Sequence, residues 1–245
     1  MQIDELMLSI STHRFATYKR LFNEIVYEPS KYDEESKMLF YLEVQSIYSH
    51  FFIPIQTLEI VLRNRIHHFQ SVHWGTSSWF KKLLAQDYAT NPTKNMYATA
   101  RTFLIKDFKD KGIKDRGPSP SDFVGKLTFS FWVELLKMEY RSTPFWQFNG
   151  KKVFPNKQKV KLGEIYDLLF RIKGVRNRLY HYEPLWDTTK VFKDTANFCD
   201  TLEDTYYLII QLIEYLSIDH KEQLETHIFY FDLEIKDFKK KYQQP

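Results

Sequence analysis

The sequence predicts an all-α protein, and two observations carry that prediction. Only 7 of the 245 residues are glycine, which disfavours a strand-rich fold with many tight turns. Apolar residues recur at intervals of three and four along most of the chain, as expected for amphipathic or buried helices. Hydrophobic residues make up 43% and charged residues 27%, the balance of a globular protein with a substantial core. Neither GxGxxG nor GxxxxGK[ST] occurs, so nucleotide-binding folds built on those loops are not indicated.

Proline and capping residues mark the first helices. Pro29 precedes Ser30 and Asp33, which are spaced as a capping box and predict a helix over residues 30–50. Pro54 suits the first turn of the next helix, because a proline there removes no helical hydrogen bond. The apolar residues that follow it fit a largely buried element.

The middle of the chain is divided by turn signals. The sequence Trp74-Gly75-Thr76 ends the second helix, and Asn91-Pro92 opens another that runs towards Lys109. The clearest loop is DRGPSPSD at Asp115–Asp122, after which a serine cap predicts a helix over Phe123–Leu136.

The last third contains two longer predicted helices. Pro144 and the pair Asn149-Gly150 bound a basic connector that we expect to be irregular. The segment Lys161–Tyr182 is helix-spaced and should end before Pro184, since proline disfavours a helical residue before it. We expect a further amphipathic helix from Asp187, as its cap, to Ile218.

Cysteine usage and hydropathy indicate a cytoplasmic protein without a membrane anchor. The single cysteine, Cys199, excludes an internal disulfide and is interpreted as a core residue. The amino terminus carries an acidic pair and no long apolar core, unlike a signal peptide. The longest apolar stretch, Tyr206–Leu216, is interrupted by polar residues and is too short to cross a bilayer.

Positive charge is clustered rather than large, with a net charge of +4. Basic runs occupy Gly150–Lys161, Arg171–Arg178 and Lys236–Lys241. Such runs are usually solvated surface, but two of them flank one motif and favour a polyanion such as RNA as a partner. The candidate RNA-binding residues are Lys151, Lys152, Lys157, Lys159, Lys161, Arg171, Lys173 and Arg178.

The motif VRNRLYHYEPLW at Val175–Trp186 carries the candidate chemistry. Asn177 and His181 are four residues apart and share a helix face, whereas Arg176 lies about 140° from His181 on an ideal helix. One helix therefore does not gather the three groups unaided. The long arginine stem, a distorted last turn or a second copy of the motif would be needed.

These residue types suit the cleavage of RNA through its 2′-hydroxyl group. A histidine titrates in the range needed for proton transfer, an arginine stabilises charge on the phosphate, and Asn177 could orient the imidazole or bind a phosphate oxygen. The chemistry needs neither metal nor cofactor, and we expect none. The competing interpretation is structural, with His181 buried among Tyr180, Tyr182 and Trp186.

A second copy of the pattern occurs in LRNRIHHF, which gives Arg63, Asn64 and His68 the same spacing. This copy could pair with the first within one chain or across a dimer. Alternatively, Glu59, Arg63 and Asn64 form a polar network that braces the core. The additional histidines do not predict a metal site, because His67, His68 and His73 do not share one helical face.

Four segments in order along the chain resemble the Abi-like (abortive infection) proteins of the HEPN superfamily. LSISTHRFATY resembles the LSxxRFxxY start of that family, and LEIVLRNRI at Leu58–Ile66 resembles its LExxLRNxI helix. KLTFSFWVELL at Lys126–Leu136 resembles LTFGFWxxLL, with Ser130 where glycine is usual. VRNRLYHYEPLW resembles RNRxxHHEP, with Tyr182 in place of the second histidine.

The resemblance covers roughly the first three quarters of the chain and implies a HEPN-like helical bundle with additional N- and C-terminal helices. We expect one Abi-like domain over residues 1–245, with a core at about 30–218 and a basic helical extension at about 219–245. In the family, paired Arg-x4-6-His motifs form a composite ribonuclease site, generally across a dimer. Carried over, Arg176 and His181 would be the catalytic pair and Asn177 the polar residue beside the arginine.

The same resemblance implies a metal-independent endoribonuclease that acts as a toxin in phage defence or in a toxin–antitoxin system. Its partners would be substrate RNA, a second copy of the chain, and an RNA or protein antitoxin. The alternative is a helical module that binds RNA or a protein partner without cleavage. Nucleotide transfer is disfavoured because no nucleotide-binding domain is recognisable in the sequence.

Overall fold

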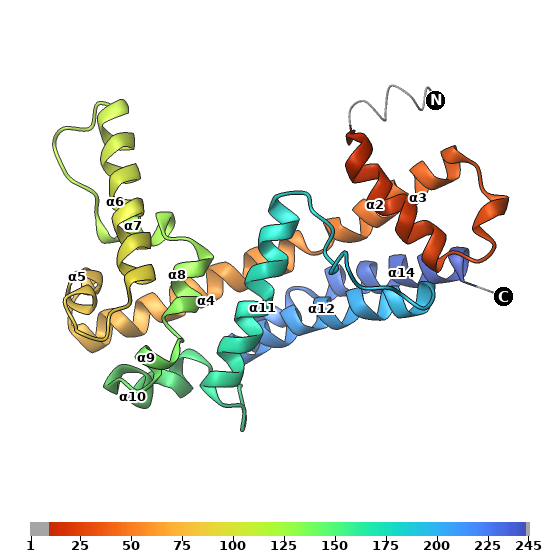
Figure 1. The fold of residues 1–245 in the computed structure, drawn as a ribbon. Helices are drawn as coiled ribbons and strands as arrows, with labels where there is room; N and C mark the ends of the chain where they lie inside the picture. Colours follow the sequence, from red (N-terminus) through yellow and green to blue (C-terminus); the bar gives the residue numbers. More distant parts are fainter. Residues whose placement is uncertain (1–9, 244–245) are drawn as a thin grey trace. The chain divides into compact units, whose positions relative to one another are not determined.

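The computed structural model describes residues 10–243, and the regular structure of this part of the chain is entirely helical (Figure 1). The prediction of an all-α protein is therefore confirmed. Residues 1–9 lie outside the described residues; they include Leu8 and Ser9 of the LSISTHRFATY segment and the acidic pair on which the absence of a signal peptide was argued. Within them, none of the helices combines the length and apolar character that a bilayer crossing requires.

Helices of different lengths follow one another along the described part of the chain. In chain order they are α2 (Thr12–Ile25), the 3₁₀ turn η1 (Pro29–Lys31), α3 (Glu34–Ser49), α4 (Phe52–Trp74), α5 (Trp79–Leu84), α6 (Asn91–Asp110), α7 (Pro120–Lys126), α8 (Phe129–Glu134), α9 (Met138–Arg141), α10 (Pro144–Val153), α11 (Leu162–Tyr180), α12 (Thr195–Leu216), α13 (Ile218–Glu222) and α14 (Glu225–Tyr242).

The chain forms two compact units, and α4, α11, α12 and α13 each contribute residues to both. The first unit contains the described residues up to Ile55, then Val175–Ile210, then the described residues from Glu222 onward. The second unit contains Gln56–Gly174 and Gln211–Lys221.

Aromatic side chains dominate the core of the first unit. Phe40 of α3 is fully buried and lies with its ring 5.2 Å from Phe22 of α2 and 5.5 Å from Phe238 of α14. Tyr242, at the end of α14, meets the Phe40 ring edge-on at 5.2 Å. Such ring pairs stabilise a core beyond their buried area. The C-terminal helix α14 is therefore part of this core.

The second unit has a separate core built around tryptophan. Trp79 and Trp132 are fully buried, with ring centres 6.3 Å apart, and Phe131 lies 6.5 Å from Trp79. Trp146 is also buried, and its indole N–H donates to the Leu135 carbonyl at 2.6 Å. The polar edges of these large side chains are thus satisfied within the core.

Two predicted helix starts are wrong because a later aspartate is the cap. Helix α3 begins at Glu34, where the Asp33 carboxylate accepts from the backbone N–H of Ser36 at 2.8 Å. Helix α12 begins at Thr195, and its cap is Asp194 rather than Asp187. Asp187 instead closes a turn by accepting from the backbone N–H and hydroxyl of Thr189 at 2.9 and 2.7 Å.

The helix predicted over Phe123–Leu136 is two short helices. Helix α7 starts earlier, at Pro120, within the expected loop, and α8 starts at Phe129. Leu127 and Thr128 between them have extended backbones, with ψ of 130° and 162°. This break lets Leu127 and Phe129 both reach buried positions.

The expected irregular connector after Pro144 is also wrong, because Asn149 and Gly150 lie within α10. The buried Asn149 side chain donates to the Phe145 carbonyl one turn earlier at 3.0 Å. A Cβ atom on Gly150 would lie 3.0 Å from the Leu162 side chain. Glycine therefore allows close packing here, where the sequence indicated a turn.

Candidate functional site at the end of α11

The last turn of α11 presents Asn177 and His181 to solvent. The backbone N–H of His181 is shared between the carbonyls of Asn177 at 3.0 Å and Arg178 at 3.2 Å, so the helix tightens as it ends. Both side chains are exposed, and Arg176 is half-buried. The structural interpretation of His181 as a core histidine is therefore wrong: of its proposed neighbours only Trp186 is buried.

The helix ends in a Schellman motif whose left-handed residue is Tyr182. Tyr182 has φ of 57°, its N–H donates to the Leu179 carbonyl at 3.1 Å, and the N–H of Glu183 donates to the Arg178 carbonyl at 2.8 Å. Pro184 follows at once, as the sequence predicted for a helix end. These bonds fix the backbone on both sides of His181.

Arg176 is directed along the helix towards an aromatic side chain. Its guanidinium carbon lies 4.4 Å from the centre of the Tyr180 ring, which in turn meets Phe52 edge-on at 5.7 Å. Tyr180 is four residues after Arg176, so the two occupy the helix stripe next to the one shared by Asn177 and His181. The angular separation predicted from the sequence thus persists in the folded helix.

The loop that follows α11, residues 181–194, is anchored by Trp186. This buried ring lies 5.3 Å from Tyr18, 6.4 Å from Tyr48 and 5.4 Å from Phe198. The Trp186 carbonyl accepts a hydrogen bond from the Arg178 guanidinium. Arg178, predicted to bind RNA, therefore has a structural contact of its own.

Two further side chains bind the backbone of this segment. The Tyr48 hydroxyl accepts from the Leu185 N–H at 3.2 Å, and Arg20 of α2 donates to the Thr188 carbonyl. Burial raises the pKa of Tyr48 well above its usual value and that of Tyr18 to about 12. Both phenols therefore stay neutral across the physiological range and act as hydrogen-bonding core residues.

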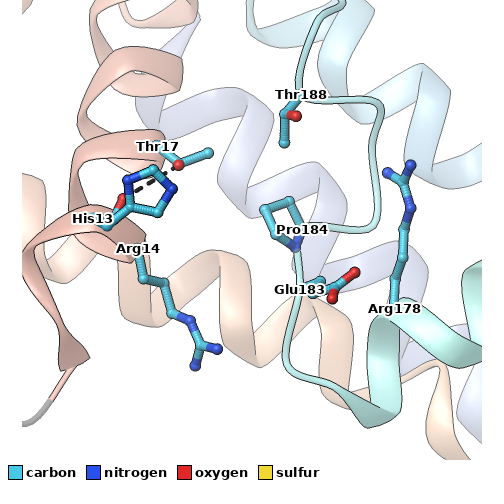
Figure 2. Close-up of a pocket in the computed structure, with 7 residues that line it drawn as sticks. All are labelled: His13, Arg14, Thr17, Arg178, Glu183, Pro184 and Thr188. Carbon is cyan, nitrogen blue, oxygen red and sulfur yellow. Dashed lines mark hydrogen bonds between the residues drawn. The ribbon is translucent and has the colours of Figure 1, made fainter.

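A cavity of about 420 Å³ lies beside this segment (Figure 2). One side is formed by α2 and the other by the end of α11 and the following loop. The lining residues are His13, Arg14, Thr17, Arg178, Glu183, Pro184 and Thr188. Arg14 comes from the LSISTHRFATY segment at residues 8–18, and Arg178, Glu183 and Pro184 come from the motif at Val175–Trp186.

The charged groups of the cavity are not neutralised by one another. Among the described residues, no ion pair within 4.0 Å joins Glu183 to Arg14 or to Arg178. Thr17 is satisfied locally, since its hydroxyl donates to the His13 carbonyl at 3.4 Å. The cavity therefore offers guanidinium donors and a carboxylate acceptor to a ligand.

The second copy of the Arg-Asn-Arg (RNR) pattern, in LRNRIHHF, lies on α4 in the second unit, and its polar groups have other contacts than those of the copy on α11. The Arg63 Nε donates to the Asn64 side-chain oxygen at 3.2 Å, which is one link of the polar network considered for this motif. Arg65 donates from Nε to the Val153 carbonyl at 2.7 Å. Asn64 and His68 are exposed, and Glu59 is half-buried.

The neighbouring histidine, His67, has a structural role. Its Nδ1 accepts from the Trp79 indole at 3.0 Å, and its ring stacks on Phe80 at 6.0 Å. Burial, with a smaller contribution from His68, lowers the pKa of His67. Across the described residues, no group of three or more histidine, cysteine or acidic side chains is arranged to hold a metal ion.

The predicted RNA-binding residues other than Arg178 belong to the second unit. Lys157 donates to the Val160 carbonyl at 2.6 Å and braces its own loop, and the Lys173 ammonium lies 4.1 Å from the centre of the Phe170 ring. The remaining five are exposed: Lys151, Lys152, Lys159, Lys161 and Arg171.

Sequence reasoning missed the α2 side of the cavity, although Arg14 lies in a segment already singled out by its family resemblance. Comparison with protein-family models, with curated protein sequences and with solved structures finds no match to this chain.

Proposed function

We propose that this protein is a metal-independent endoribonuclease of the Abi-like HEPN type. The 2′-hydroxyl group attacks the adjacent phosphate, the bond from phosphorus to the 5′-oxygen breaks, and the products are a 2′,3′-cyclic phosphate end and a 5′-hydroxyl end. The observation that carries the proposal is the exposure of His181 and Asn177 on one stripe of the last turn of α11, beside a cavity with two guanidinium groups. Biologically, such an enzyme would act as a toxin in phage defence or in a toxin–antitoxin system.

The roles follow from the side-chain chemistry. His181 is the proton-transfer group, because it is a solvent-exposed imidazole on a fixed backbone. Asn177, one turn earlier, orients the imidazole or donates to a phosphate oxygen. Arg176 supplies positive charge for the pentavalent phosphate through its forked donors.

The Arg176 side chain does not lie on the same helix stripe as His181, so one copy of α11 does not form a complete catalytic site. A guanidinium held over Tyr180 and a histidine on the next stripe do not face one reacting phosphate from a single helix. We propose that a second copy of α11 in a homodimer supplies the complementary groups. This separation of Arg176 from His181 also favours the alternative function, a module that binds RNA or a protein partner without cleaving.

The deciding experiment incubates purified wild type and His181→Ala with total bacterial RNA in EDTA, followed by analysis of the RNA ends. We expect cleavage only by the wild type, with 2′,3′-cyclic phosphate ends. The matched control is His227→Ala, which removes an exposed histidine from α14 of the same unit and should cleave normally.

Each outcome separates the two functions. Equal cleavage by wild type and His181→Ala would exclude His181 as the proton-transfer group. Intact RNA after long incubation at high protein concentration, together with salt-dependent RNA binding, would instead support the non-cleaving module.

A further inference from the structure

We infer that the cavity between α2 and the loop after α11 is a binding site for one nucleotide of single-stranded RNA. In this site Arg14 contacts a phosphate, and the Glu183 carboxylate accepts from an N–H donor of the base. The inference extends the proposed function, because it gives the chain a substrate contact beyond Arg176, Asn177 and His181.

The size and position of the cavity suit this ligand. Its volume of about 420 Å³ falls in the range of ordinary small-ligand sites, which run from about 300 to 1,000 Å³. Glu183 is two residues after His181, and the Schellman hydrogen bonds fix the backbone between them. A nucleotide bound to Glu183 would therefore be held by a residue whose position relative to His181, the proposed proton-transfer group, is fixed.

The charge pattern selects a ligand that carries both an anion and a hydrogen-bond donor. Arg14 extends from the first turns of α2, as Figure 2 shows, and no ion pair of Arg14 occurs among the described residues. Arg178 uses one guanidinium nitrogen on the Trp186 carbonyl and keeps donors on its other nitrogens. A simple anion would satisfy the two arginines but would be repelled by Glu183.

A nucleotide meets both requirements within one molecule. Its phosphate accepts forked hydrogen bonds from arginine, and the edge of its base offers N–H groups to a carboxylate. Guanine offers two neighbouring N–H donors on its Watson–Crick edge and is therefore the expected preference. Exposed bases also stack on imidazole rings, and His13 supplies one at the cavity wall.

The backbone of the cavity is braced before any ligand binds. The Thr188 carbonyl is bound by Arg20, and the Leu185 N–H donates to the Tyr48 hydroxyl at 3.2 Å. Trp186, between them, is buried. A braced loop loses little conformational freedom on binding, as a specific site requires.

The test measures binding of fluorescent single-stranded RNA to the His181→Ala protein, so that cleavage does not interfere. Adding Arg14→Ala should weaken binding at least about tenfold, because a hydrogen bond to a charged group is lost. It should also reduce the slope of log affinity against log salt by roughly 0.7, the value for one phosphate contact on a single strand. Arg14→Lys should restore the slope but only part of the affinity.

Glu183→Gln tests the base contact separately. It should leave the salt slope unchanged and abolish the preference for an RNA containing guanosine over the same RNA containing inosine, which lacks the amino group. The matched control is Lys106→Ala, which removes one exposed positive charge from α6, outside the three basic runs, and should change neither property. Titration with guanosine monophosphate alone distinguishes a site for free nucleotide from one that requires the RNA chain.

The outcomes separate this inference from the proposed function. If the wild type cleaves RNA but Arg14→Ala keeps full affinity and an unchanged salt slope, the nucleotide site is wrong and the ribonuclease stands. If no RNA is cleaved but binding depends on Arg14 and Glu183 as described, the nucleotide site stands and the ribonuclease is wrong.

Discussion

Replacing Tyr182 by glycine should stabilise this protein, although the position lies inside its most distinctive motif. Tyr182 has φ of 57° and the residue is 67% exposed, so it bears the cost of a left-handed backbone with little burial in return. That conformation costs an L-residue about 1–2 kcal/mol. Glycine relieves the cost but loses about 0.5–1 kcal/mol through its greater freedom in the unfolded chain. The balance is a gain of roughly 0.5–1 kcal/mol.

The assay is urea unfolding followed by far-ultraviolet circular dichroism. The variant Tyr182→Gly should raise the free energy of unfolding by that amount, which corresponds to roughly 1–4 °C in melting temperature for a chain of this size. Tyr182→Ala is the control, because alanine keeps the Cβ atom and the strain and should change stability little. A gain with alanine equal to that with glycine, or a loss with glycine, would refute the assignment of strain at this position.

Two further predictions concern the aromatic anchor of the loop that follows α11. Trp186→Ala should lower the free energy of unfolding by about 3–5 kcal/mol, because it opens a cavity beside Tyr18 and Phe198. The control Phe148→Ala, at an exposed ring, should change the free energy of unfolding by less than about 0.5 kcal/mol in the same urea titration. Similar losses in both variants would contradict this prediction. Alkaline pH should also destabilise the fold, since the pKa of Tyr18 is raised from 10.0 to about 12 in the folded protein. The neutral Tyr18 phenol contributes its full stabilisation below pH 10, and this contribution is lost as the pH rises towards 12. Tyr18→Phe should therefore flatten the fall in unfolding free energy above pH 10 by up to about 1.4 kcal/mol per pH unit, and an unchanged slope would contradict the assignment.

The sequence alone predicts most helices because their signals are local. Helices α4 and α6 have a proline in the first turn and apolar residues at helical spacing, and their observed bounds agree with the prediction to within a few residues. Helix α11 ends just before Pro184, as expected from the restriction that proline places on its neighbour.

The wrong boundaries arise where tertiary packing decides between equivalent local signals. Asp187 and Asp194 are both good capping residues, each with Thr next to it, but Phe192 between them is buried and the helix starts only after it. Similarly, the pair Asn149-Gly150 is typical of a turn, yet Gly150 is in α10 because Leu162 packs against it. No local pattern distinguishes these cases.

In the candidate site, too, the features set by local helix geometry could be predicted from the sequence, and those set by tertiary packing could not. The shared stripe of Asn177 and His181, and the different direction of Arg176, follow from helical geometry and could be predicted. The α2 wall of the cavity could not be predicted, because Arg14 and Glu183 are distant in sequence and come to line one cavity only in the fold, where Tyr18 of α2 packs on Trp186. The exposure of His181 also had to come from the structure, since its aromatic neighbours in sequence equally suited a core position.

The two RNR copies, on α4 and α11, share the same structural use of one arginine. In each copy the second arginine is structural: Arg178 donates to the Trp186 carbonyl, and Arg65 donates to the Val153 carbonyl at 2.7 Å. In each copy the asparagine and the histidine are exposed. Binding a backbone carbonyl would favour an arginine whether or not the chain cleaves RNA, so the repeated RNR by itself is no evidence of a nuclease. Asn64 has a structural contact as well, since it accepts from the Arg63 Nε at 3.2 Å, but the exposed Asn177 and His181 have no such structural explanation. For that reason His181 is the residue on which the function must be tested.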